Sequence, residues 1–166
     1  MESNIRDVIK EIIPYILIII FAVLVKKYVV SPIRVNGASM DNTLRNGDIM
    51  ILNKIGYSYD SIDRFDIVVV KYGDEELIKR IIGLPGELVE YKDNKLYIDG
   101  KLIKENFSKG KTEDFSFEVP AKQYFVMGDN REVSLDSRKI GSFSLNDIDG
   151  STSLVIFPFN RFGKKE

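Results

Sequence analysis

Lys79 is the residue whose surroundings point most directly to chemistry. It lies in the apolar run from Leu77 to Ile82, in a chain of 166 residues that contains neither histidine nor cysteine. The chain therefore cannot form a Ser-His-Asp triad, a Cys-His dyad or a metal site with histidine ligands. Burial disfavours the charged ammonium and lowers the pKa of a lysine from about 10.4, so a buried Lys79 could take the proton of a serine hydroxyl. The alternative is an ordinary solvated lysine on a strand, which is the commoner case.

Two polar motifs could supply partners for such a lysine. The first spans residues 35–44 and contains Ser39, a candidate nucleophile, within Gly-Ala-Ser-Met. The second spans residues 128–138 and reads Gly-Asp-Asn-Arg-Glu-Val-Ser-Leu-Asp-Ser-Arg. Taken singly, a Gly-x-Ser is usually a turn, and a loop rich in Asp, Asn and Ser usually bonds to its own backbone. Only the three motifs together indicate a catalytic site.

An apolar N-terminal segment indicates where these residues would work. No charge occurs over residues 12–25, and the apolar character resumes after Lys26 and Lys27. Residues 12–30 would make about 28 Å of helix, close to the ~30 Å hydrocarbon core of a bilayer. We therefore predict a short N-terminal tail over residues 1–11 and a transmembrane anchor over residues 12–30.

Two other interpretations of this segment stay open. A cleavable secretory signal would need a small-x-small site, and none follows the apolar stretch. A buried core helix is compatible with the uninterrupted length, but the rest of the chain shows strands with no need of a very apolar helix. Pro14 falls in the first turn of the apolar run, where its missing N–H does little harm.

The remainder of the chain, residues 31–166, is predicted to be one mainly β domain. The clearest hairpin carries Asp99-Gly100, because this pair supplies the positive φ angles of a tight turn. Residues 106–118 are polar and charged and are expected to form an exposed loop or extended ribbon, and residues 145–148 one helical turn. Strands are expected at residues 33–35, 48–52, 67–72, 77–84, 88–91, 95–98, 101–103, 123–127 and 151–157.

The composition narrows the classes of partner. A net charge of −1 and a pI near 5.7 argue against a nucleic-acid partner, because such a partner usually requires a basic face on the protein. The absence of cysteine excludes a disulfide framework. We therefore expect no nucleic-acid partner, no metal and no cofactor.

In this order, the apolar segment and the three motifs resemble bacterial type I signal peptidase, the membrane-bound serine protease that removes signal peptides. The resemblance covers nearly the whole chain. It rests most firmly on Lys-Arg-Ile-Ile-Gly-x-Pro-Gly-Glu, which begins at Lys79, and on the motif at residues 128–138. A single apolar span and only 48 residues between Lys79 and Gly128 make the chain more similar to the compact Gram-positive forms. The resemblance implies a signal-peptidase-like antiparallel β-sheet or barrel domain, preceded by one transmembrane helix.

The resemblance also implies roles for particular residues. Ser39 would be the nucleophile and Lys79 the general base, and the Ser134 hydroxyl would position the lysine amine through a hydrogen bond. Three charged residues would support the loop that carries Ser134: Arg80, and Asp136 paired with Arg138.

The implied substrate is a preprotein bound in an extended conformation. It would add a strand beside those of Ser39 and Lys79, with alternate side chains in small apolar pockets. Small residues at −1 and −3 of the cleavage site are expected, because larger ones would clash. The residues that match pocket positions of the family are equally plausible as plain core residues: Val35, Leu44, Leu77 and Ile78. Membrane lipid is the other expected partner.

Two positions depart from the family pattern. Asn42 stands where a proline is usual, which predicts a looser turn after the nucleophile and retained but weaker activity. Gly37 stands where some members carry a serine that donates to the oxyanion, so a backbone group or water must replace that hydroxyl. The family's topology implies a single-pass protein of the cell membrane, with a cytoplasmic N-terminus and the catalytic domain outside. The basic residues that follow the span weakly favour the opposite orientation, and we follow the family.

Two rival functions stay open. A self-cleaving regulator of the LexA/UmuD type also uses a Ser-Lys dyad on a related β fold. Such proteins are cytosolic, and the repressors carry a helix-turn-helix for which this chain has no room. The second rival is a catalytically weakened or inactive membrane-anchored β module, in which Asn42 would mark relaxed constraint.

Overall fold

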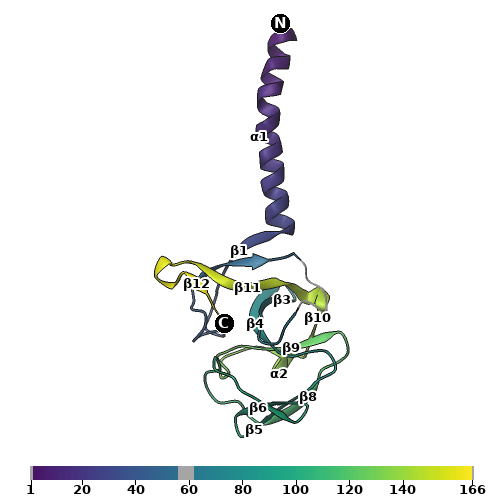
Figure 1. Ribbon diagram of the computed structural model, residues 1–166, viewed down its shortest axis with the longest axis vertical. Helices are drawn as coiled ribbons and strands as arrows, with labels where there is room; N and C mark the ends of the chain where they lie inside the picture. Colours follow the sequence, from purple (N-terminus) through teal and green to yellow (C-terminus); the bar gives the residue numbers. More distant parts are fainter. Residues whose placement is uncertain (1, 56–61, 166) are drawn as a thin grey trace.

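A long N-terminal helix leads into a body of antiparallel strands (Figure 1). The computed structural model describes residues 2–55 and 62–165. The helix, α1 (Glu2–Tyr28), begins well before the expected span, so Pro14 lies in its interior and not in its first turn. Residues 8–28 are long and apolar enough to cross a membrane, and none of this window is buried by the rest of the chain. An unburied helix that is apolar on all sides fits a membrane anchor.

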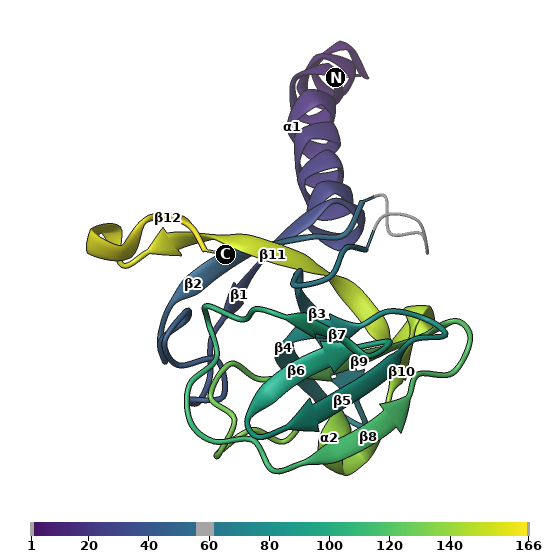
Figure 2. The same ribbon diagram turned by 60° about the horizontal axis from the view of Figure 1, so that its bottom comes forward.

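The strands form two antiparallel sheets. The larger sheet has the order β1-β2-β11-β3-β4-β9-β10, with β12 paired to β11, and the smaller has the order β7-β6-β5-β8. Figure 2 shows the smaller sheet crossing the end of the body that lies away from α1. The strands of the larger sheet are β1 (Val30–Arg34), β2 (Ile49–Asn53), β3 (Ile67–Tyr72), β4 (Glu75–Gly83), β9 (Gln123–Met127), β10 (Phe143–Ser144), β11 (Ile148–Phe157) and β12 (Gly163–Lys164). Those of the smaller sheet are β5 (Leu88–Lys92), β6 (Lys95–Ile98), β7 (Lys101–Ile103) and β8 (Phe115–Glu118).

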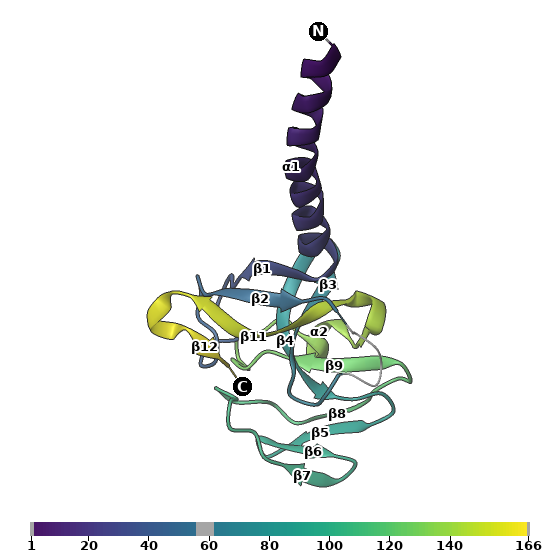
Figure 3. The same ribbon diagram turned by 45° about the horizontal axis from the view of Figure 1, so that its top comes forward.

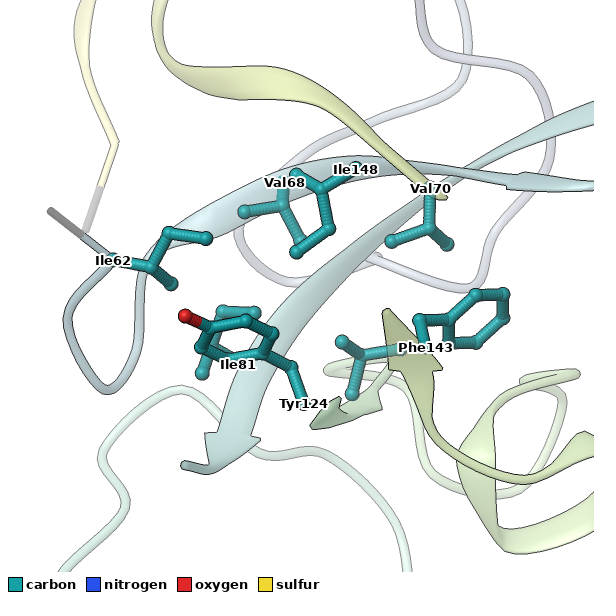
Figure 4. Close-up of a cluster of buried hydrophobic side chains, with 8 residues drawn as sticks. Ile62, Val68, Val70, Ile81, Tyr124, Phe143 and Ile148 are labelled. Carbon is teal, nitrogen blue, oxygen red and sulfur yellow. The ribbon is translucent and has the colours of Figure 1, made fainter. Parts of the chain in front are cut away.

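Three buried clusters hold the sheets together. The first packs Ile62 and side chains of β3, β4, β9, β10 and β11 against each other (Figure 4): Ile62, Val68, Val70, Ile81, Tyr124, Val126, Phe143 and Ile148. A second joins β4 and β9 to the smaller sheet, and a third packs beneath the turn that follows β1. The strand β4 therefore lies between the first two clusters, because Ile81 packs in the first and Ile82 in the second. Its successive side chains point to opposite faces of the sheet.

The sequence predicts this architecture in outline, and the mainly β fold behind one apolar helix is confirmed. The hairpin of β6 and β7 is also confirmed, with φ of +50° at Asp99 and +75° at Gly100. The short helical turn is present as η2 (Leu145–Asp147). Residues 106–118 were expected to form an exposed loop or extended ribbon, and part of this segment is the strand β8, which pairs with β5. The strands β10 and β12 were not predicted, and each has only two residues.

Candidate active site

The structure brings Ser39 and Lys79 together at the edge of an open groove. Ser39 lies in the turn that follows β1, and Lys79 lies on β4. The Nζ atom of Lys79 is 3.0 Å from Ser39 Oγ and 3.1 Å from the carbonyl oxygen of Ile78. The lysine is only 2% exposed. The solvated-lysine alternative is therefore wrong for this residue, and the pair has the distance that proton transfer requires.

Burial changes the protonation of Lys79. Loss of hydration lowers its pKa from 10.5 to about 8, and the negative charges of Asp136 and Asp129 offset only part of that shift. Desolvation acts in this direction because it penalises the charged form of a lysine. A substantial fraction of the amine is therefore neutral under mildly alkaline conditions, and a neutral amine can accept the serine proton.

Asn130 and Asp129 lock the turn of Ser39 onto the second polar motif. The backbone N–H of Asn130 donates to the carbonyl oxygen of Ser39 at 2.9 Å, and its side-chain amide donates to Ala38 O at 3.1 Å. The hydroxyl of Thr43 donates to Asp129 Oδ2 at 2.5 Å. The sequence analysis did not assign these roles, although all three polar residues lie within its motifs. No local sequence pattern indicates these hydrogen bonds, because the residues that they join are far apart in the chain.

Arg80 lies beside Lys79 but faces a different set of partners. Its guanidinium forms a two-point pair with Asp129, at 2.8 and 2.7 Å, and donates to Phe65 O. It also lies over the ring of Phe107, 4.0 Å from the centroid. Both members of the ion pair are almost completely buried. Because Asp129 in turn accepts from Thr43, Arg80 supports the loop at residues 128–138 and the serine turn together.

Ser134 is buried close to Ser39, but its hydroxyl does not bond Lys79 in this structure. Ser134 is 0% exposed, and among residues 2–55 and 62–165 no group meets its Oγ with good hydrogen-bond geometry, although the hydroxyl lies near enough to the Asp136 carboxylate to help lower the pKa of that group. A β-carbon placed on Gly128 would lie 2.3 Å from Ser134 Oγ and 2.5 Å from Ser39 O, so the two serines flank this glycine. The expected hydrogen bond to the lysine is therefore not formed here.

Asp136 and Arg138 brace the loop that carries Ser134. The two side chains pair through Arg138 Nε and Nη2, each 2.8 Å from a carboxylate oxygen of Asp136. The same carboxylate accepts from Gly128 N at 3.0 Å, and Arg138 also donates to the carbonyl oxygen of Arg131. Burial raises the pKa of Asp136, but the arginine and the Gly128 amide outweigh that effect and keep it below its ordinary value. The carboxylate therefore stays charged beneath the loop at neutral pH.

A groove of about 740 Å³ extends from the Ser39–Lys79 pair along β1 and β4. Val35, Leu77 and Ile78 line it, as the resemblance implies for three of the four pocket residues. Leu44 differs: it is 0% exposed, packs in the third buried cluster and does not line the groove. The helical turn after Ser39 directs this side chain inward, because the N–H of Leu44 bonds back to Met40 O at 2.8 Å. Leu44 is therefore a core residue here.

The turn after Ser39 has a conformation that proline cannot adopt. Asn42 has φ of +108°, whereas the proline ring holds φ near −65°. Besides the bonds from the second motif, an exposed ion pair between Asp41 and Lys109 at 2.7 Å contacts the turn. Lys109 belongs to the segment predicted as an exposed loop, and its backbone bonds both Asp129 and Arg131. Lys109 thus contacts both the turn that follows Ser39 and the loop at residues 128–138.

We expect Asn42→Pro to lower the turnover of substrate about tenfold or more, although proline is usual in the family at this position. The ring would force the turn to rearrange and displace Ser39 from Lys79. Asn42→Gly is the matched control, because glycine reaches positive φ without strain and should keep near-parent activity. Steady-state rates of both variants test the conformation, and a fully active Asn42→Pro would contradict it.

Comparisons with known proteins agree with one another. The family model described as "Signal peptidase, peptidase S26" matches residues 5–157. Signal peptidase I S of Bacillus subtilis (strain 168) is 39% identical over an alignment 163 positions long, and the alignment covers 90% of this chain and 89% of that protein. Signal peptidase IB of Staphylococcus aureus (strain COL) is 33% identical over an alignment 178 positions long, with coverages of 95% of this chain and 93% of that protein. The crystal structure of a signal peptidase I from Enterococcus faecalis V583 is 37% identical, with a TM-score of 0.51, over 55% of this chain and 96% of that chain.

Proposed function

This chain belongs to the signal peptidase family, peptidase S26, and we propose that it removes signal peptides from preproteins by a Ser-Lys dyad mechanism. The observation that carries the mechanism is the 3.0 Å approach of Lys79 Nζ to Ser39 Oγ in a buried setting. Family membership disfavours the self-cleaving cytosolic regulator. The membrane-anchored but inactive module is the rival that an assay must exclude.

Acylation begins with the neutral amine of Lys79. It takes the proton of the Ser39 hydroxyl while Oγ attacks the carbonyl carbon of the scissile bond. The resulting oxyanion is stabilised by the backbone N–H of Ser39, and Gly37 leaves the second donor to a backbone group or water. The lysine ammonium then gives its proton to the leaving amine, the C–N bond breaks, and the signal peptide remains as an ester on Ser39.

Deacylation uses the same base. Lys79, again neutral, takes a proton from a water molecule that attacks the ester carbonyl. The tetrahedral intermediate collapses, the Ser39 oxygen recovers the proton from the lysine, and the signal peptide leaves with a new carboxyl end. Lys79 is the only side chain of the protein that has to change its charge during the proposed cycle.

Ser134 is proposed to position Lys79 once substrate is bound. Its buried hydroxyl lies across Gly128 from Ser39, and we expect bound substrate to bring it into contact with the amine. Asp136, Arg138 and Arg80 would hold the loop still during that movement through the ion pairs described above.

The groove is the proposed site for the segment that precedes the cleavage point. A second cavity shares its outer wall of Pro32, Ile33 and Glu76, and this cavity also contacts Lys26 and Lys27 at the end of α1. The groove therefore leads from the membrane anchor to the dyad, which suits a substrate held in the bilayer by its signal peptide. Side chains at −1 and −3 would enter its apolar end, where small residues fit best.

The orientation of the chain is proposed from the function. Signal peptides are removed after translocation, so the domain that follows α1 should lie outside the cytoplasm and the N-terminus inside. The bias of the basic residues after the span is weak evidence beside this requirement. Protease added to intact protoplasts should digest the domain in this orientation and leave it intact in the opposite one.

A cleavage assay tests the activity directly. The full chain in lipid vesicles is incubated with a preprotein, and the new N-terminus of the product is sequenced. We expect one cut after a small residue, and no cut with Ser39→Ala. A parent protein as inactive as this variant under several lipid compositions would favour the inactive module instead.

We expect the pH dependence of the reaction to follow the ionisation of Lys79. The base acts only when neutral, and its pKa is about 8. The value of kcat/KM should therefore rise nearly tenfold per unit at pH 6 to 7 and level off above pH 8 to 9. Initial rates across pH 6 to 10 measure this rise of kcat/KM and the plateau that follows it. A profile that is flat between pH 6 and 8 would rule out Lys79 as the base.

A further inference from the structure

A buried ion pair joins the smaller sheet to the loop at residues 128–138. Arg131 of the loop pairs with Glu105, which lies between β7 and β8, at 2.5 Å. The hydroxyl of Tyr91, on β5, accepts from Arg131 and donates to Glu105. The side chain of Arg131 is 1% exposed and that of Glu105 is 7% exposed. Arg131 therefore depends on these two partners, because an unpaired buried charge is strongly unfavourable.

The same guanidinium holds a glycine of the active site. Arg131 Nε donates to the carbonyl oxygen of Gly128 at 3.0 Å, and the N–H of Gly128 donates to Asp136 at 3.0 Å. Both backbone polar groups of this glycine are thus bonded to side chains. The space that a β-carbon of Gly128 would need is filled by Ser39 O and Ser134 Oγ. The position of Gly128 therefore bears directly on the position of the nucleophile.

The backbone between β7 and β8 makes a second attachment to this loop. The N–H of Lys109 donates to Asp129 O at 2.8 Å, and its carbonyl oxygen accepts from Arg131 N at 2.9 Å. Lys109 and Asn130 form a short parallel bridge. The loop is therefore fastened to the smaller sheet through its backbone and through the side chain of Arg131.

The smaller sheet lies outside the groove beside the dyad. Figure 3 shows this sheet at the end of the body opposite α1, next to β9. Among the residues that the structure describes, those that line the groove fall within 32–40 and 74–79, together with Val69. A change in the smaller sheet should therefore reach the reaction through the loop and alter the chemical step more than substrate binding.

We propose that Arg131 is a positioning residue for the Ser-Lys dyad, and that the smaller sheet holds it in place through Glu105 and Tyr91. Arg131 acts through Gly128, which supports the turn of Ser39. The smaller sheet thereby keeps the loop in the conformation that the reaction needs. The inference rests on the proposed peptidase function, so its test includes a readout that does not require activity.

Glu105→Gln tests the link, because it removes the charge of the side chain and keeps its size. For the full chain in lipid vesicles we expect kcat to fall at least about tenfold, since a small displacement of Ser39 from Lys79 is enough for such a loss. KM should stay within about twofold of the parent value, because Glu105 does not line the groove.

Glu87→Gln is the matched control. The Glu87 carboxylate pairs with Arg64 at 2.5 Å and accepts from the N–H of Leu84 at 2.7 Å, in the turn between β4 and β5. Loss of this partly buried pair should also destabilise the fold. The control should nevertheless keep the kcat of the parent when rates are normalised to the folded fraction.

Tyr91→Phe is the second variant. It removes only the hydroxyl that bonds Arg131 and Glu105, and it keeps the ring that stacks on Phe115. We expect kcat to fall about threefold. This variant decides the question if Glu105→Gln does not fold.

Amide hydrogen exchange of residues 128–138 is the readout that does not require activity. Exchange in this loop should be at least about tenfold faster in Glu105→Gln than in the parent, and unchanged in β3. In Glu87→Gln the loop should exchange as it does in the parent.

Full kcat in a folded Glu105→Gln protein overturns the proposal, and so does an equal loss of kcat in Glu87→Gln. A raised KM with unchanged kcat also overturns it, because the effect would then lie in substrate binding. If Glu105→Gln does not fold, full kcat in Tyr91→Phe has the same meaning. An inactive parent would refute the proposed peptidase function, and loop exchange would then decide the link: faster exchange supports it, and unchanged exchange overturns it.

Discussion

Replacing Lys79 by methionine should abolish cleavage and, at the same time, make the protein more stable at neutral pH. Activity should fall by at least about a thousandfold, because no other basic side chain approaches Ser39 Oγ among the residues that the structure describes. Stability should rise because a lysine held at a pKa of about 8, against 10.5 when free, costs about 3 kcal/mol when it is protonated in the folded state.

The sign of the pH effect follows from the protons bound in each state. Between pH 8 and 10.5 the unfolded lysine is protonated and the folded one is largely neutral, so the parent protein gains stability as pH rises. Below pH 8 Lys79 is protonated in the folded protein as well, and the full cost of burying its charge lowers the stability. The advantage of Lys79→Met should therefore be about 1 to 3 kcal/mol at pH 7 and should shrink toward pH 10.

Denaturant unfolding of the full chain in detergent micelles, at pH 7 and pH 10, measures this difference. Lys95→Met is the matched control, because Lys95 is an exposed strand lysine of the smaller sheet. It should change neither activity nor stability by much. A Lys79→Met variant that is less stable than the parent at pH 7 would show that the lysine is a structural residue.

The sequence predicts the elements of the site better than their contacts. The apolar neighbours of Lys79 suggest its burial, although a solvated strand lysine is the commoner case and stays open until the structure is known. Asp99-Gly100 predicts its hairpin because the constraint is local. By contrast, the bond from Asn130 to Ser39 depends on how two distant loops fold over each other, and no local pattern encodes that approach.

At two places the structure is more definite than the sequence analysis. The strand β8 was not listed among the expected strands, because the charges around it indicated an exposed loop or extended ribbon, although Phe115-Ser116-Phe117-Glu118 alternates as a half-buried strand does. The rings of Phe115 and Phe117 both pack on Phe125. For Leu44 the sequence left the groove and the core equally plausible, and the structure places it in the core. Its burial depends on partners such as Met50 and Val155, which the motif does not include.

Gly128→Ala should cost most of the activity although it adds a single methyl group. The new β-carbon would lie 2.5 Å from the carbonyl oxygen of Ser39 and 2.3 Å from Ser134 Oγ, and a backbone atom cannot move aside cheaply. The Ser39 carbonyl also accepts from Asn130, so the serine turn would shift as a unit. A displacement of about 1 Å between reacting groups lowers kcat by roughly a hundredfold.

Gly83→Ala separates this effect from general destabilisation. A β-carbon there would lie 2.4 Å from a methyl group of Val89, in the buried cluster between the two sheets and away from the dyad. Both variants should lose about 1 to 3 kcal/mol of stability through overpacking. Only Gly128→Ala should lose kcat when rates are normalised to the folded fraction. Equal kcat in the two would mean that the contact of Gly128 with both serines supports the fold and not the position of the nucleophile.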